Sequence, residues 1–157
     1  MEKRNVTVSA IVAAIVLIGD QLSKHWAESW LRTNGEYKIW DGVLHLRYVE
    51  NRGAAFGMMQ GGKWFFLAIT GIACAAMLYF LIKERKRLHF MMTFSLALLL
   101  SGAIGNLIDR VALGYVRDMI YVALIDFAVF NVADMAVTVG CCLLVLDLLF
   151  FKGKKYM

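Results

Sequence analysis

Four long apolar runs dominate the pattern of hydrophobic and polar positions along the chain. Each comes close to the roughly 20 residues that an α-helix needs to cross a hydrocarbon layer about 30 Å thick. Charged residues gather between the runs and at their ends. We therefore predict four membrane-spanning helices, at residues 6–22, 64–82, 90–107 and 132–151.

The first long connection, residues 23–63, carries two further patterns. The segment "HWAESWLR" places Trp26 and Trp30 on one face and extends the first helix. An Asp41-Gly42 turn signal then precedes residues that alternate between apolar and polar: Leu44, His45, Leu46, Arg47 and Tyr48. Such alternation is typical of a strand with one covered face, so we predict a small antiparallel sheet resting at the membrane interface.

The second long connection, residues 108–131, is more apolar than a solvated loop should be. We expect it to lie along the membrane surface or over a cavity, and a short amphipathic helix would suit its composition. Hydrophobic residues make up 61% of the chain and charged residues 18%, a balance typical of polytopic membrane proteins. The expected architecture is an all-α membrane protein with one domain over residues 1–157.

The basic residues give this architecture an orientation. The net charge of +5 could suggest nucleic-acid binding, but the cations bracket the apolar runs instead. Dense clusters lie at Lys3 and Arg4, at Lys83, Arg85, Lys86 and Arg87, and at Lys152, Lys154 and Lys155. By the positive-inside rule both termini and the 83–89 turn are cytoplasmic, and the sheet is extracytoplasmic. Residues 6–22 end without a small-residue cleavage site, so we interpret them as a retained span.

Several polar residues are predicted to meet near the outer boundary of the membrane. A rise of about 1.5 Å per residue places Asp134 about 26 Å, Asp109 about 29 Å and Asp20 about 21 Å above the inner ends of their helices. Lys24, Asn106, Arg110 and Asn131 lie close to these acids in the sequence. Because ionisable groups at membrane depth tend to face the bundle interior or water, we infer a shared polar site.

Each of these acids also has a purely structural explanation. Asp134 could be a first-turn acid that the helix dipole favours. Asp109 with Arg110 could be an interfacial pair, and Asp20 with Lys24 an i, i+4 bridge. Their convergence at one depth favours the shared site. Two other acids stand apart: Asp147, near the inner end of the last span, is expected to have no catalytic role, and Asp126 stays open.

The chain lacks the motifs of several hydrolase classes. It has no HExxH, GxSG or GxGD motif, which disfavours zinc, serine and presenilin-like chemistry. His25, His45 and His89 are far apart in the predicted topology, and Cys74, Cys141 and Cys142 lie inside spans without metal-ligand spacing, so no metal site is expected. What remains is carboxylate chemistry, in which two acids share a proton and activate water.

Five motifs resemble those of lipoprotein signal peptidase, the type II signal peptidase of bacteria, along essentially the whole chain. They are "DQLSK" at 20–24, "NRGAAFG" at 51–57, "GAIGNLIDR" at 102–110, "GYVRD" at 114–118 and "FNVAD" at 130–134. Together, in this order and spacing, they are highly specific. The sequence departs from the family pattern at Ser101, where glycine is usual, and at Met119, where an aromatic is common; neither concerns the chemistry.

The resemblance implies an aspartyl endopeptidase whose catalytic pair is Asp118 and Asp134. The implied substrate is a prolipoprotein with a diacylglyceryl-modified cysteine, cut on the amino side of that cysteine in the bacterial cytoplasmic (inner) membrane. It implies no metal or organic cofactor, membrane lipids as partners, no nucleic acid, and inhibition by cyclic peptides of the globomycin type. The supporting residues would be Asp20, Lys24, Asn51, Gly53, Ala54, Gly105, Asn106, Asp109, Arg110, Asn131 and Ala133.

These supporting residues divide by expected role. Asn51, Asn106 and Asn131 could orient the aspartates or bind substrate backbone, while Asp109 and Arg110 brace the third span. Asp20 and Lys24 would position the outer connections, and the small residues leave room for a peptide. A rival reading, a small ion or proton-coupled transporter, needs polar groups through the full membrane thickness; another, a structural assembly factor, would not depend on the aspartates.

Overall fold

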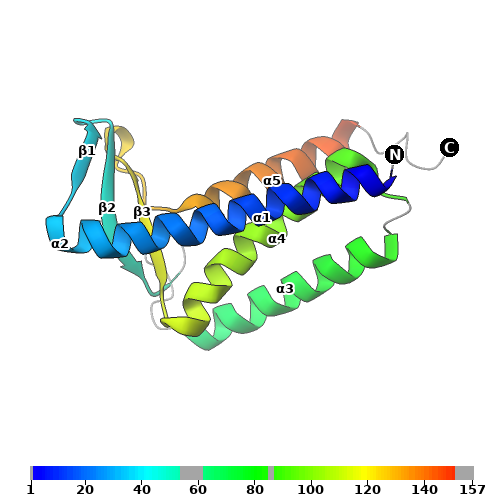
Figure 1. Ribbon diagram of the computed structural model, residues 1–157, viewed down its shortest axis with the longest axis horizontal. Helices are drawn as coiled ribbons and strands as arrows, with labels where there is room; N and C mark the ends of the chain where they lie inside the picture. The colour runs from blue at the N-terminus through cyan, green and yellow to red at the C-terminus, as the bar shows by residue number, and fades with distance from the viewer. Residues whose placement is uncertain (1, 54–61, 85–86, 151–157) are drawn as a thin grey trace.

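Four long helices form a bundle that carries a small sheet at one end (Figure 1). The computed structural model describes residues 2–53, 62–84 and 87–150. Within these residues the long helices are α1 (Glu2–Trp26), α3 (Lys63–Glu84), α4 (Phe90–Ala112) and α5 (Val132–Phe150). Each belongs to a helical segment long and apolar enough to cross a membrane, so the four predicted spans are confirmed.

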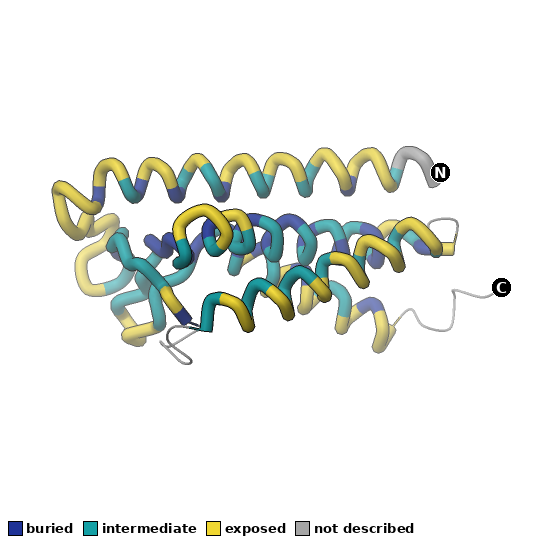
Figure 2. The backbone as a smooth tube through the Cα atoms, turned by 90° about the horizontal axis from the view of Figure 1, so that it is seen from below, coloured by how far each residue is buried: buried dark blue, intermediate teal, exposed yellow. Residues whose placement is uncertain are grey.

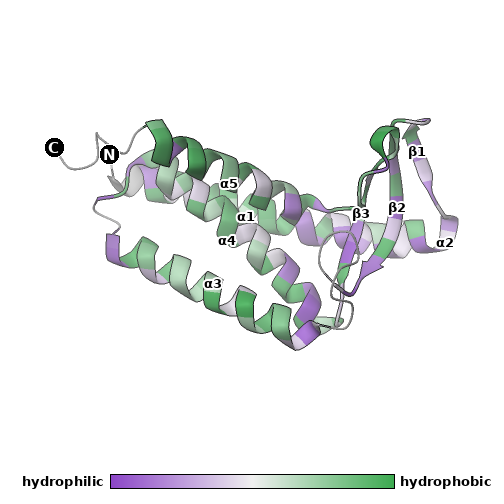
Figure 3. Ribbon diagram, turned by 180° about the vertical axis from the view of Figure 1, so that it is seen from behind, coloured by the Kyte–Doolittle hydropathy of each residue, from purple (hydrophilic) through white to green (hydrophobic). Residues whose placement is uncertain are grey.

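Helix α4 forms the centre of the bundle and packs against α5, α1 and α3. Glycines in α4 permit this close packing. A Cβ on Gly102 would collide with the backbone of Ala133, and one on Gly105 would lie 2.6 Å from Asp20 Oδ2. By contrast, α3 packs mainly on α4 and has no buried residue among those described. Many large apolar residues of the helices are exposed, as expected for helices in lipid. Figure 2 colours much of the helices as exposed, and Figure 3 colours them mainly as hydrophobic.

The first connection folds as the sequence predicts. Helix α1 continues through a π-helical turn, η1 (Ala27–Leu31), and a short α2 (Arg32–Asn34). Strands β1 (Tyr37–Trp40) and β2 (Leu44–Asn51) then pair antiparallel around the predicted turn, where Gly42 adopts φ 71°. The rings of Trp26 and Trp30 stack with centroids 5.8 Å apart.

The second connection differs from the helical expectation. Residues Val116–Val122 form strand β3, which pairs antiparallel with β2 and gives the sheet order β1-β2-β3. One 3₁₀ turn, η3 (Ala123–Ile125), follows it. β-branched residues suit a strand. The edge of β2 that β1 does not occupy presents unpaired backbone groups, and pairing with β3 satisfies them. The return segment then pairs with β3 through an Ile120–Phe130 bridge, which brings the start of α5 beside the strand.

Candidate active site

Asp118 lies in β3, opposite Val49 of β2, and its carboxylate is held by two amides. Asn51 Nδ2 donates to Asp118 Oδ2 at 3.0 Å, and Asn131 Nδ2 donates to Asp118 Oδ1 at 2.6 Å. The residue is only 2% exposed. Burial first, and the neighbouring Asp134 carboxylate second, raises the pKa of Asp118 to about 7, although both amides act in the opposite direction.

Asp134 lies in the first turn of α5, where it forms a reciprocal capping box with Asn131. The Asp134 backbone N–H donates to Asn131 Oδ1 at 2.9 Å, and the Asn131 backbone N–H donates to Asp134 Oδ2 at 3.1 Å. The explanation of Asp134 as a first-turn acid at a helix end therefore applies to one of its carboxylate oxygens, Oδ2. The other oxygen, Oδ1, accepts a bond from Asn106 Nδ2 of α4 at 2.8 Å.

Asn131 connects the two carboxylates. The same amide that caps α5 through its oxygen donates through its nitrogen to Asp118 and, at 3.1 Å, to Asn106 Oδ1. Asn131 is completely buried, so its amide has one orientation that satisfies these bonds. A single side chain thus sets the positions of Asp118 and Asp134 relative to each other.

A buried cluster of charges lies behind the two aspartates. Lys24 and Asp20 form the predicted i, i+4 bridge at 2.8 Å, and Lys24 also donates to Asn106 Oδ1 at 2.8 Å. Asp20 Oδ1 in turn accepts the Ala133 backbone N–H at 2.9 Å and so caps α5 from another helix. Lys24 Nζ lies 3.8 Å from Asp109, and all three charged side chains are fully buried.

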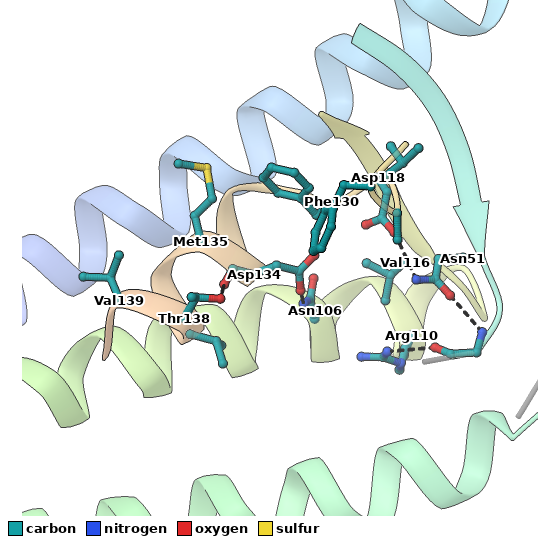
Figure 4. A pocket seen from close by; sticks show the side chains of 15 residues that line it. Asn51, Asn106, Arg110, Val116, Asp118, Phe130, Asp134, Met135, Thr138 and Val139 are labelled. Atoms are coloured by element: carbon teal, nitrogen blue, oxygen red, sulfur yellow. Dashed lines mark hydrogen bonds between the residues drawn. The ribbon is translucent and has the colours of Figure 1, made fainter. Parts of the chain in front are cut away.

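The two aspartates open into one pocket of about 590 Å³ between the sheet, α4 and α5 (Figure 4). Its polar end is lined by Asn51, Gly53, Asn106, Arg110, Asp118 and Asp134. Its apolar side is lined by Phe127, Phe130, Met135, Val137 and Val139, and therefore continues along α5. Arg110 donates to Gly53 O at 3.4 Å, and its guanidinium lies 5.1 Å from the Phe66 ring centroid.

The structure brings together the predicted site residues that it describes, and it places the two acids that stood apart in the sequence, Asp147 and Asp126, elsewhere. Asp147, whose Oδ1 lies 2.8 Å from His89 Nε2, is near the opposite end of α5 from Asp134. Asp126 accepts a bond from Tyr121 Oη at 2.6 Å and is exposed outside the pocket lining. Ala54 lies outside the described residues.

The interfacial pair that was the structural alternative for Asp109 is not the one that the described residues form. Asp109 is not the partner of Arg110; it forms a salt bridge of 2.8 Å with Arg117, because its carboxylate faces the sheet and α1 while Arg110 faces the pocket. Arg117 was not among the predicted site residues, and neither were Gln21 and Glu28, which contact it. The only signal was its place beside Asp118 within "GYVRD".

Within the described ranges, no three His, Cys, Asp or Glu side chains are grouped so that they could hold a metal ion. The pocket therefore offers two amide-bound carboxylates and a nearby guanidinium as its reactive and polar groups. Such an arrangement can hold one carboxyl protonated beside one that is ionised, which is suited to the activation of water.

Comparison with known proteins identifies the family of the chain. The family model described as signal peptidase (SPase) II matches residues 12–150. The lipoprotein signal peptidase of Streptococcus thermophilus (strain CNRZ 1066) is 46% identical over 142 residues, 90% of this chain and 92% of that protein. That of Clostridioides difficile (strain 630) is 43% identical, over 92% of this chain and 97% of the relative.

Solved structures lead to the same conclusion. A bacterial membrane enzyme determined by the in meso method at 2.3 Å resolution superimposes with a TM-score of 0.86 at 33% identity, covering 95% of this chain and 92% of that one. A second such structure, at 1.9 Å resolution, gives a TM-score of 0.81 at 34% identity, over 92% of this chain and 94% of the other. The chain therefore belongs to the lipoprotein signal peptidase family, the signal peptidase II hydrolases, which are multi-pass bacterial membrane enzymes that remove signal peptides from lipoproteins.

Proposed function

We propose that this chain is an intramembrane aspartyl endopeptidase in which Asp118 and Asp134 form the catalytic pair. Its substrate is a prolipoprotein whose cysteine carries diacylglycerol, and the scissile bond is the peptide bond on the amino side of that cysteine. The observation that carries the proposal is that both carboxylates line one pocket and are joined by the Asn131 amide.

The proposed chemistry uses one proton shared by the pair. The ionised carboxylate removes a proton from water, which attacks the scissile carbonyl, and the protonated carboxyl donates its proton to the carbonyl oxygen to give a tetrahedral gem-diol. The carboxyl that took the proton from water then passes it to the leaving nitrogen as the C–N bond breaks, while the other carboxylate takes a proton back from the gem-diol, so the pair again shares one proton. A pKa of about 7 for Asp118 supports a protonated carboxyl at neutral pH. Because close carboxyls titrate as a pair, the shared proton belongs to Asp118 and Asp134 together and is not assigned to one of them.

The pocket suits a substrate that is part peptide and part lipid. The amide and guanidinium groups at its polar end can bind the peptide backbone, and the apolar residues along α5 can contact acyl chains or the signal helix. A cyclic peptide of the globomycin type would inhibit by occupying the same pocket. Gly53 lines the pocket, where a residue without a side chain leaves room for a peptide. Gly105 and Ala133 let α4 and α5 approach closely beside Asp20, which supports a positioning role for them.

The site is proposed to lie near the outer leaflet, with both termini in the cytoplasm. Helix α1 begins, and α5 ends, at the end of the bundle opposite the sheet (Figure 1). Lys83 and Arg87, which flank the α3–α4 turn, lie at that same end, as the positive-inside rule requires for the cytoplasmic side. The stacked Trp26 and Trp30 at the sheet end suit the opposite interface.

The transporter reading has less support. Ser95 and Ser101, buried in α4 on the inner side of the site, donate to backbone carbonyls of their own helix at 2.7 and 2.9 Å. Both hydroxyls are therefore satisfied within their own helix. The lysine and aspartates of α1 and α4 that contact one another lie beside β3, whereas the buried Asp147 contacts His89 near the other end of α5. A transporter would need polar groups that continue from one of these clusters to the other.

The purified protein in detergent should cleave a diacylglyceryl-modified precursor and leave the unlipidated precursor of the same sequence intact. EDTA should not change the rate, because carboxylate chemistry needs no metal. Mass spectrometry of the products would locate the cleaved bond. Equal cleavage of both precursors, a cut elsewhere, or activity that EDTA removes and a metal ion restores would contradict the proposal.

Activity should also decline as the pH rises above about 7. The pKa of Asp118 is raised to about 7, so its proton is present below that pH and is lost above it. When the shared proton is lost the pair has no acid, and kcat/KM should fall about tenfold per pH unit. Initial rates on the lipidated precursor between pH 5 and 9 would test this, and a constant rate up to pH 9 would be inconsistent with a shared proton.

A further inference from the structure

Arg117 connects the strand that carries Asp118 to the helix bundle. It directly precedes Asp118 in β3, and because side chains alternate along a strand the two point to opposite faces. The Arg117 guanidinium donates two hydrogen bonds to the Asp109 carboxylate of α4, from Nε at 3.1 Å and from Nη2 at 2.8 Å. The Arg117 backbone N–H donates to the same carboxylate at 2.9 Å. This is a bidentate, charge-assisted contact to a completely buried acid.

The same guanidinium reaches two further segments. Nη1 donates to Glu28 Oε2 of η1 at 3.0 Å, and Nη2 donates to Gln21 Oε1 of α1 at 3.3 Å. On the opposite side of the residue, the Asn131 amide that binds Asp118 approaches the Arg117 carbonyl at 3.5 Å. One residue thus ties β3 to α1, η1, α4 and the start of α5. At 9% exposure it is buried among these partners.

We propose that Arg117 is a positioning residue that holds the Asp118 carboxylate opposite Asp134. The inference rests on the proposed catalytic role of Asp118. The physical basis is that a residue has two soft backbone torsions, so fixing both the backbone and the side chain of Arg117 restricts the direction in which Asp118 leaves the strand. A displacement of about 1 Å at a catalytic group can cost about 100-fold in rate.

A simpler role would be neutralisation of Asp109, and the substitution Arg117→Lys separates the two. Lysine keeps the positive charge but lacks the planar fork, so it cannot hold Asp109, Glu28 and Gln21 together. We expect Arg117→Lys to lower kcat by about tenfold or more, with KM within about twofold, because the pocket that binds substrate is unchanged. Arg117→Met should lose at least as much.

The pH profile distinguishes displacement of Asp118 from loss of folded protein. A loosened Asp118 is less buried and farther from Asp134, so its pKa falls and the alkaline limb moves to lower pH. A smaller folded fraction lowers the rate equally at every pH and leaves the limb in place. Glu28→Gln removes one contact and keeps the Asp109 fork, so it should give a smaller fall in kcat in the same direction, and it remains informative if Arg117→Met fails to accumulate.

The matched control is Arg47→Met, which removes an arginine that pairs with Glu36 and lies over Tyr121 within the outer part of the sheet. It should retain kcat within about twofold. Wild-type kcat in Arg117→Lys, a defect in KM alone, or a lower rate with an unmoved alkaline limb would overturn the inference. Activity in asparagine variants of Asp118 or Asp134 would instead refute the proposed function, so the two failures are distinguishable.

Discussion

Replacement of Asp118 or Asp134 by asparagine is expected to reduce turnover of a lipidated precursor by about 10³-fold or more, with the protein still folded. Asparagine has nearly the shape of aspartate but can neither accept a proton from water nor donate one to a carbonyl, so either substitution removes one half of the pair. The measurement is the single-turnover rate of each purified variant, with folding checked by thermal unfolding in detergent.

Two matched aspartates provide the controls for this experiment. Asp147→Asn makes the same change in the same helix as Asp134, beside His89 near the other end of α5, and should leave turnover within about twofold. Asp126→Asn removes an exposed acid whose contact is the Tyr121 hydroxyl, and should behave likewise. Full activity in either catalytic-pair variant would refute the pair, and complete loss in Asp147→Asn would mean that the site is elsewhere.

Lys24→Met is expected to destabilise the fold strongly, by about 3–5 kcal/mol. Lys24 is completely buried between Asp20, at 2.8 Å, and Asp109, at 3.8 Å. Methionine fills similar space but leaves the buried Asp20 carboxylate without its ammonium, while Asp109 keeps its salt bridge to Arg117. An uncompensated buried charge is costly. For a chain of this size the loss corresponds to a fall of about 10 °C in the unfolding midpoint in detergent.

The surface pair of Lys38 and Asp41 offers the matched comparison. Its N–O distance is also 2.8 Å, but the lysine side chain is 55% exposed. Lys38→Met should therefore lower the unfolding midpoint far less than Lys24→Met, because water screens an exposed pair. Adding Asp20→Asn to Lys24→Met should recover part of the lost stability, because it removes the carboxylate that Lys24→Met leaves without a cation. If Lys24→Met unfolds at the wild-type temperature, the buried cluster does not stabilise the fold as described.

The sequence predicted the elements whose signal is local. Each span is recognisable because hydrocarbon thickness and helical rise set its length, and the β1–β2 hairpin because alternation and an Asp-Gly turn lie within a few residues of each other. Strand β3 was harder, because an apolar stretch covered on both faces has the same pattern as a short buried helix. Its partner, β2, is more than 60 residues away, from Asn51 to Val116.

For the charged residues beside the site, the sequence predicts the position along the helix but not the direction of the side chain. Helical rise predicts that Asp20, Asp109 and Asp134 lie near one depth. In the structure Lys24 contacts both Asp20 and Asp109, and Asp20 caps the helix that carries Asp134. However, the depth of an acid does not determine which residue its side chain contacts. Asp109 turns to Arg117 and Lys24, while Asp134 turns to Asn106 and the pocket.

By itself, the sequence determined the four spans, their order and the boundary at which polar groups gather, because the length and hydropathy of a segment act along the chain. Only the tertiary structure decided which polar groups meet. The α4 glycines bring α5 and α1 close, the β2–β3 register brings Asp118 to Asn51, and the capping amide of Asn131 joins β3 to α5. Those contacts depend on how helices rotate and strands align, which packing between distant segments sets.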